Sequence, residues 1–148
     1  MKKLTLVFNF WNHKELKDYL LSLKGVNVVS INDEEDLIID FEYDEKEISP
    51  KILRYEVLAF MDVSYPSLVS FNLHEANTKK YKIVVKDVCC EYCFMDMIDE
   101  LFATKGIISA NSDYDVIKYH YNVNLYIEYD PMFITGDDLK RMEEEYNR

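Results

Sequence analysis

The feature that most restricts the fold is a pattern that occurs twice along the 148-residue chain. Lys24-Gly25-Val26 returns as Lys105-Gly106-Ile107, and Glu42-Tyr43-Asp44 returns as Glu128-Tyr129-Asp130. The two registers differ by five residues, which gives the second copy a longer hairpin, Asn111 to Asn122. An internal repeat of this length indicates two copies of one small domain.

Hydrophobic periodicity predicts the order strand, helix, strand, strand, helix, strand in the first copy. Its predicted strands cover residues 4–8, 26–31, 37–43 and 68–73, and its helices run from a capping box at Asn12 to Leu23 and from Ser49-Pro50 to Phe60. The second copy restarts after a polar linker, residues 75–80, and reaches Arg148 without a closing strand. We therefore predict an α+β protein with two ferredoxin-like βαββαβ domains in tandem, residues 1–74 and 81–148, the second lacking its final strand.

The missing strand has a consequence for the second sheet. A βαββαβ unit orders its strands 4-1-3-2, so loss of the fourth strand exposes the backbone of residues 81–85. An exposed strand edge is a template for another strand. We expect the first domain or a second copy of the chain, in a homodimer, to cover it.

The net charge of the chain limits the classes of partner that it is expected to bind. The formal net charge is −11, with 8 basic and 14 acidic groups in residues 1–78 and 9 and 14 in residues 79–148. Neither half has a basic face, which argues against nucleic acid and anionic membranes as partners. No apolar run is long enough for a membrane span, and Asn9 interrupts the N-terminal apolar run too early for a signal peptide.

All three cysteines, Cys89, Cys90 and Cys93, lie within five positions between a predicted strand and a predicted helix. An odd, clustered set offers no disulfide framework, so a reducing cytoplasm is the simpler setting. The helix is predicted from a buried face with helical spacing, which comprises Phe94, Met97, Ile98, Leu101 and Phe102. The positive end of a helix dipole favours thiolate over thiol, and thiolates bind soft metal ions.

Three interpretations of the cysteines remain open at this point. Cys90 and Cys93 form a Cys-x-x-Cys pair that can hold a soft ion, and Cys89 either joins as a third ligand or faces the core. Asp87, Glu91 and Asp96 are close enough in sequence to offer oxygen ligands to Zn(II). Alternatively, the cysteines are small apolar residues in a fold that has lost its metal, or they form a redox dithiol.

The repeat with Cys-x-x-Cys after its first strand resembles the heavy-metal-associated (HMA) domain family. That family includes copper chaperones, mercury-binding proteins and the N-terminal modules of heavy-metal P-type ATPases. The resemblance covers residues 81–146 and rests on Cys90, Cys93, Gly106-Ile107 and Tyr129-Asp130-Pro131. It implies that Cys90 and Cys93 are the metal ligands. The first copy has Asn9 and Asn12 at the equivalent positions and is a degenerate copy without thiols.

The second copy departs from the family pattern at three points. Asp87 and Val88 stand where the family usually has Gly and Met, the closing strand is missing, and Cys89 is an addition. Paired cysteines occur in zinc- and cadmium-handling members, so Cys89 favours a site that is not restricted to copper.

The predicted function is therefore non-enzymatic: soluble binding or shuttling of a soft metal ion, Cu(I), Zn(II) or Cd(II). The sequence contains no nucleophilic triad or phosphate-binding loop. The resemblance implies a metal-transporting ATPase or another thiol-bearing acceptor as partner. The alternative is a metal-free regulatory module, similar in architecture to ACT domains, that dimerises through the free edge. The Tyr-rich hairpin with Tyr114, Tyr119 and Tyr121 is interpreted as sheet surface.

Overall fold

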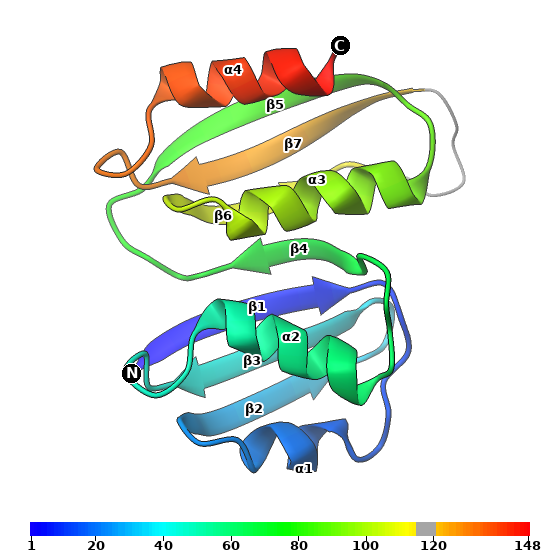
Figure 1. The fold of residues 1–148 in the computed structure, drawn as a ribbon, viewed down its shortest axis with the longest axis vertical. Helices are drawn as coiled ribbons and strands as arrows, with labels where there is room; N and C mark the ends of the chain where they lie inside the picture. Colours follow the sequence, from blue (N-terminus) through cyan, green and yellow to red (C-terminus); the bar gives the residue numbers. More distant parts are fainter. Residues whose placement is uncertain (115–120) are drawn as a thin grey trace. The chain divides into compact units, whose positions relative to one another are not determined.

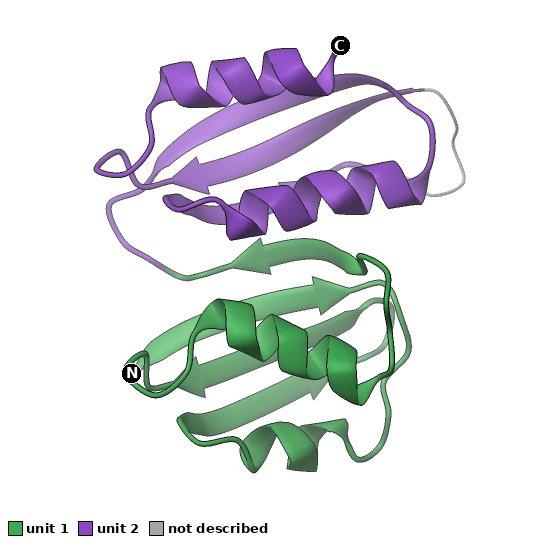
Figure 2. Ribbon diagram, in the orientation of Figure 1, with its two compact units in different colours: residues 1–74 green, residues 75–148 purple. Residues whose placement is uncertain are grey.

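The computed structural model describes residues 1–114 and 121–148, so Tyr119 lies outside the described part of the chain. It has antiparallel strands and four helices. The chain divides into two compact units, unit 1 with Met1–His74 and unit 2 with Glu75–Arg148 (Figure 2).

Unit 1 has the predicted order of elements. These are β1 (Lys2–Phe8), α1 (Leu16–Leu21), β2 (Val26–Asn32), β3 (Leu37–Tyr43), α2 (Pro50–Phe60) and β4 (Leu68–Asn72) (Figure 1). Strand β1 pairs antiparallel with β3 and β4, and β3 also pairs with β2, which is the predicted order 4-1-3-2. The alternate residues Leu4, Leu6 and Phe8 of β1 are fully buried, so the core lies on one face of this sheet.

The N-termini of the two helices of unit 1 were both predicted from capping residues, and one of the two predictions is correct. Helix α2 begins as predicted, because Ser49 Oγ accepts a hydrogen bond from the Ile52 amide and Pro50 occupies the first turn. The predicted capping box at Asn12 is wrong. Helix α1 begins only at Leu16, and the Asn12 amide group donates instead to Asp33 Oδ2 at 3.3 Å. His13 Nδ1 accepts a hydrogen bond from the Glu15 amide, and this contact forms part of the non-helical turn that precedes α1.

Unit 2 comprises β5 (Lys79–Val88), α3 (Glu91–Ala103), β6 (Ile107–Ser112), β7 (Tyr121–Tyr129) and α4 (Gly136–Tyr146). The central strand β7 pairs antiparallel with β5 and with β6. Strand β5 begins at Lys79, two residues before the predicted start of the second domain. The described residues that follow α4 form no strand.

The same backbone lock joins a glycine to the turn after a strand in both units. Gly25 and Gly106 have φ of +96° and +97°, a conformation that side chains rarely allow. The Gly25 carbonyl accepts the Asp44 amide and the Gly106 carbonyl accepts the Asp130 amide, each at 2.8 Å. This lock holds the strand that follows helix 1 of each unit to the loop that precedes helix 2.

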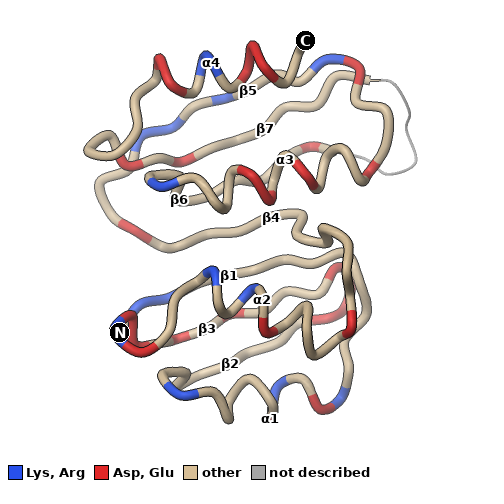
Figure 3. The backbone as a smooth tube through the Cα atoms, in the orientation of Figure 1, with Lys and Arg blue, Asp and Glu red and all other residues tan. Residues whose placement is uncertain are grey.

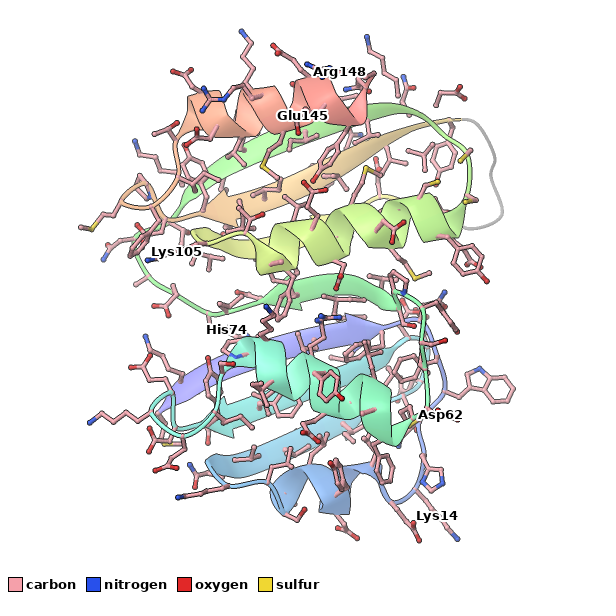
Figure 4. All side chains as sticks on the ribbon, in the orientation of Figure 1. Lys14, Asp62, His74, Lys105, Glu145 and Arg148 are labelled. Carbon is pink, nitrogen blue, oxygen red and sulfur yellow. The ribbon has the colours of Figure 1, made fainter. Side chains whose placement is uncertain are left out.

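The loop after β7 packs closely on Gly106. A Cβ atom on Gly106 would lie 2.9 Å from both Ile134 Cγ2 and Phe133 Cβ. Lys105, labelled in Figure 4, adds a cation–π contact, with its Nζ 4.5 Å from the centroid of the Phe133 ring. The space beside Gly106 is therefore filled by the loop that the lock fixes.

The predicted exposure of the backbone of residues 81–85 is wrong at Val84, because helix α4 caps this part of the edge. The Val84 amide donates to Glu143 Oε2 and the Lys86 amide donates to Asn147 Oδ1, both at 2.7 Å. The Asn147 side-chain amide donates in turn to the Val84 carbonyl at 2.9 Å. Side chains from the same unit thus supply hydrogen bonds that a neighbouring strand would otherwise make.

Charged residues of both signs are interspersed along both units (Figure 3). This distribution agrees with the acidic excess counted in each half of the sequence. No helix in the described part of the chain is long and apolar enough to cross a membrane.

Replacing Gly106 with Ala should destabilise unit 2 by about 2–4 kcal/mol, because the methyl group meets Ile134 and Phe133 and the left-handed backbone disfavours alanine. Hydrogen exchange of the β7 amides measures the loss. Gly136→Ala is the matched control, since its Cβ would meet only the Tyr129 hydroxyl at 3.8 Å. Equal protection of β7 in both variants would contradict the packing described here.

Replacing Glu143 with Ala should lower the free energy of unfolding by about 1 kcal/mol and speed hydrogen exchange of the Val84 amide. The reason is that the part-buried hydrogen bond from this amide to Glu143 Oε2 is lost. Glu144→Ala is the control, since it removes a carboxylate from the next position of α4, where the side chain is exposed. If the Val84 amide exchanges at the same rate in both variants, the hydrogen bond from Val84 to Glu143 does not protect this edge.

Candidate metal centre

A β-bulge near the end of β5 sets the direction of the cysteines. The pairing of β5 with β7 shifts register between Val85 and Val88, and Asp87 adopts φ of +55° there. The extra residue reverses the alternation, so that Val88 is buried and Cys89 is exposed. Without the bulge, simple alternation from Val85 would direct Cys89 inward. The alternative that Cys89 faces the core is therefore wrong.

The departures at Asp87 and Val88 are explained by this geometry. Aspartate is among the few non-glycine residues that tolerate a left-handed backbone, which is the conformation that Asp87 adopts in the bulge. The Asp87 amide donates to Asn122 Oδ1 at 3.2 Å, which ties the bulge to β7. Val88 is only 4% exposed and fills the apolar position.

Helix α3 begins at Glu91, so Cys90 is its N-cap residue and Cys93 lies in its first turn. Its fully buried residues are Phe94, Met95, Ile98 and Leu101. Met97 and Phe102, which were predicted on the buried face, are only half-buried, and Met95 takes a place in the core instead. Because Phe94 faces the core, Cys93 beside it is turned outward and is exposed.

The three sulfur atoms meet at the start of α3. Cys89 Sγ lies 3.2 Å from Cys93 Sγ, Cys90 Sγ lies 3.6 Å from Cys93 Sγ, and Cys89 Sγ lies 4.0 Å from Cys90 Sγ. Within the described residues, no histidine or carboxylate joins this group of possible metal ligands. The oxygen ligands suggested by Asp87, Glu91 and Asp96 are therefore not part of the cluster.

The helix start and the neighbouring thiols separate the acidities of two cysteines. The pKa of Cys90 is lowered, first by the Cys93 backbone amide that points toward its sulfur and then by the hydrogen bond with the Cys93 thiol. The Cys90 side chain makes no capping hydrogen bond. The Cys93 amide therefore favours the Cys90 thiolate through the attraction between its N–H dipole and the negative charge on sulfur. The hydrogen bonds with Cys89 and Cys90 raise the pKa of Cys93 to about 12. Cys90 therefore ionises before Cys93.

An aromatic stack adjoins the cluster. The Tyr114 ring lies parallel to the Phe94 ring with centroids 4.5 Å apart, and the Tyr121 ring stacks on Tyr114 at 6.0 Å. Burial, followed by the charges of Tyr121, Glu91 and the cysteines, raises the pKa of Tyr114 to about 12. This hydroxyl therefore stays neutral near the thiols. The sequence interpretation of the tyrosines as plain sheet surface missed this stack.

The equivalent loop in unit 1 has a different lining. Phe10 stacks on the buried Phe8 with centroids 5.1 Å apart, whereas Trp11 is 90% exposed. A cavity of about 270 Å³ adjoins the loop, and it is lined by Phe10, Trp11, Asn12, Asp33, Glu34 and Glu35. Aromatic, amide and carboxylate groups offer no soft ligand, so the lining of this cavity differs in chemistry from the thiol cluster of unit 2.

Unit 1 also holds a polar arrangement that the sequence did not reveal. Thr5 Oγ1 donates a hydrogen bond to Asp40 Oδ1 and lies 2.7 Å from Nε2 of His74, which is two residues beyond the end of β4 (Figure 4). The residues come from β1, from β3 and from the segment after β4, so the sheet pairing brings them together. In a nucleophilic triad the imidazole stands between hydroxyl and carboxylate, whereas here the hydroxyl is in the middle. The arrangement is therefore not a triad.

The chain matches no family model and no curated protein. Among solved structures it is similar to the N-terminal soluble domains of CopA from Bacillus subtilis, determined in solution. The identity is 14%, the alignment covers 97% of this chain and 88% of that chain, and the TM-score is 0.39.

Alkylation of the reduced protein with iodoacetamide near neutral pH should modify Cys90 before Cys93, by at least about tenfold in rate, because the pKa of Cys90 is lowered and that of Cys93 is raised. Fragment mass spectrometry of the labelled peptide gives the order. Cys90→Ser should remove this fast reaction. Preferential labelling of Cys93 would show that the helix start does not activate Cys90.

Proposed function

We propose that the chain binds a soft metal ion through Cys90 and Cys93, with Cys89 as a third thiolate, and passes it to a thiol-bearing acceptor. The acceptor class includes metal-transporting ATPases. The proposal includes two ferredoxin-like copies of one domain, residues 1–74 and 81–148. The first would be a scaffold without thiols, and the second would lack the final strand. A reducing compartment such as the cytoplasm suits free thiols of this kind.

One observation carries the proposal: three sulfur atoms lie within 4.0 Å of one another at an accessible helix start. Each cysteine is at least partly exposed, so an ion can reach the sulfurs. The lowered pKa of Cys90 provides a first thiolate, which is the form that binds metal.

The spacing of the sulfurs fits several soft ions. With metal–sulfur bonds of about 2.3 Å, two sulfurs of a tetrahedral zinc site are about 3.8 Å apart, and two sulfurs in linear coordination are about 4.6 Å apart. The observed separations of 3.2, 3.6 and 4.0 Å lie on the tetrahedral side. Zn(II) or Cd(II) would bind here with little movement, whereas linear Cu(I) between Cys90 and Cys93 would require the sulfurs to separate.

The openness of the cluster suits transfer rather than storage. Three protein ligands leave a coordination position through which an incoming thiolate can approach. The acceptor's thiolates would then replace those of this chain one at a time, so that the ion is never without ligands. No reaction of the ion or of a substrate is needed, which accords with a non-enzymatic role.

The test is a titration of the reduced full chain with Cu(I) and with Zn(II) against a competing chelator. We expect one ion per chain, and we expect Cys90→Ser and Cys93→Ser to lower the affinity by more than about tenfold, since each removes a ligand. Asp96→Asn is the matched control on the exposed surface of α3 and should bind like the unaltered chain, because Asp96 is not in the cluster.

Two results would count against the proposal. If the unaltered chain binds neither ion, the thiols have no role as metal ligands. If the serine variants bind as tightly as the unaltered chain, the ion lies elsewhere.

A further inference from the structure

The number of sulfur ligands in the thiol cluster differs from the number that Zn(II) or Cu(I) usually takes. The cluster comprises three sulfur atoms, and no histidine or carboxylate of the described residues joins them. Zn(II) prefers four ligands, and Cu(I) is satisfied by two. Building on the proposed function, we infer that this cluster is a trithiolate site for a trivalent metalloid ion, As(III) or Sb(III), with Cys89 as an obligatory ligand.

The triangle of sulfurs supports pyramidal coordination. Three sulfurs around a planar three-coordinate ion with bonds of about 2.3 Å would be about 4.0 Å apart. Two of the three observed separations, 3.2 and 3.6 Å, are shorter than that. An ion with bonds of this length therefore has to stand above the plane of the sulfurs. A trivalent metalloid bound to three sulfurs is pyramidal because its lone pair occupies the fourth direction, and it needs no fourth ligand.

The charge of the site favours the same ion class. Three thiolates carry three negative charges, which a trivalent ion neutralises completely, whereas Zn(II) leaves one negative charge and Cu(I) leaves two. Residues 86–96 add three carboxylates, Asp87, Glu91 and Asp96, and only one lysine, Lys86. The net charge of the chain is −11, so residual negative charge at the cluster is disfavoured.

The aromatic stack next to the cluster contributes without adding charge. Tyr114 stacks on Phe94, the residue that follows Cys93, with the two ring centroids 4.5 Å apart. A neutral aromatic surface on this flank favours a neutral complex over an anionic one, because charge is costly beside apolar groups.

Binding involves no change in oxidation state. The hydrated ion enters as its trihydroxide, and each cysteine thiol replaces one hydroxide. Three sulfur–metalloid bonds form, three oxygen–metalloid bonds break, and the three thiol protons leave with the hydroxides as three water molecules. No oxidant, reductant or further reactant is required.

The experiment compares arsenite with phenylarsenoxide, which has only two exchangeable positions, and with Cu(I). The reduced full chain should bind one arsenic atom from arsenite, seen in native mass spectrometry as a gain of one arsenic less three protons. Cys89→Ser should lose arsenite affinity by more than about tenfold, the lower range for removing a group that supports a bound metal. It should bind phenylarsenoxide and Cu(I) nearly as well as the unaltered chain, because each of these needs only two thiolates and Cys90 and Cys93 are both retained.

Each outcome decides between the two proposals. If Cu(I) or Zn(II) binds but arsenite does not, the metalloid inference is overturned and the proposed function stands. If Cys89→Ser binds arsenite as tightly as the unaltered chain, the third thiolate is not a ligand and the inference is overturned. If no ion binds at all, the proposed function fails together with the inference.

Discussion

The positions of the three sulfur atoms depend on one extra residue in β5. The bulge between Val85 and Val88 reverses the alternation of the strand, which buries Val88 and turns Cys89 toward solvent. Helix α3 acts on the same segment from the other side, because burial of Phe94 turns Cys93 outward. Cys90 lies between these two constraints as the N-cap residue. Core packing, rather than any attraction between the thiols, therefore brings the sulfurs together.

The two units share a framework but differ at this loop. Gly25 and Gly106 lock onto Asp44 and Asp130 with the same hydrogen-bond length, so the ends of the sheets away from the loop are fixed in the same way. In unit 1 the residue at the position of Cys89 is Phe8, which continues the buried alternation of β1. A strand without the bulge thus places an aromatic ring in the core where the bulged strand places a thiol outside.

Unit 2 satisfies its strand edge with a helix. Glu143 and Asn147 of α4 bond to the backbone of Val84 and Lys86, where another strand could otherwise pair. These hydrogen bonds are local to one unit and need no second chain. They also hold the backbone of β5 at the point where the bulge begins, so the capped edge and the thiol cluster belong to one connected segment.

The sequence by itself determined the order of the elements, the start of α2 at Ser49-Pro50 and the grouping of the cysteines at a strand-to-helix junction. These features follow from periodicity, capping chemistry and local spacing, which act over a few residues. The incorrect prediction of a helix start at Asn12 shows the limit of local sequence patterns, because the Asn12 side chain donates a hydrogen bond to Asp33, which is distant in sequence. Only the tertiary structure decided that Cys89 faces outward, that Tyr114 stacks beside the thiols and that α4 caps β5. Each depends on pairing between segments distant in sequence, and a single-residue bulge is enough to change which side chains meet.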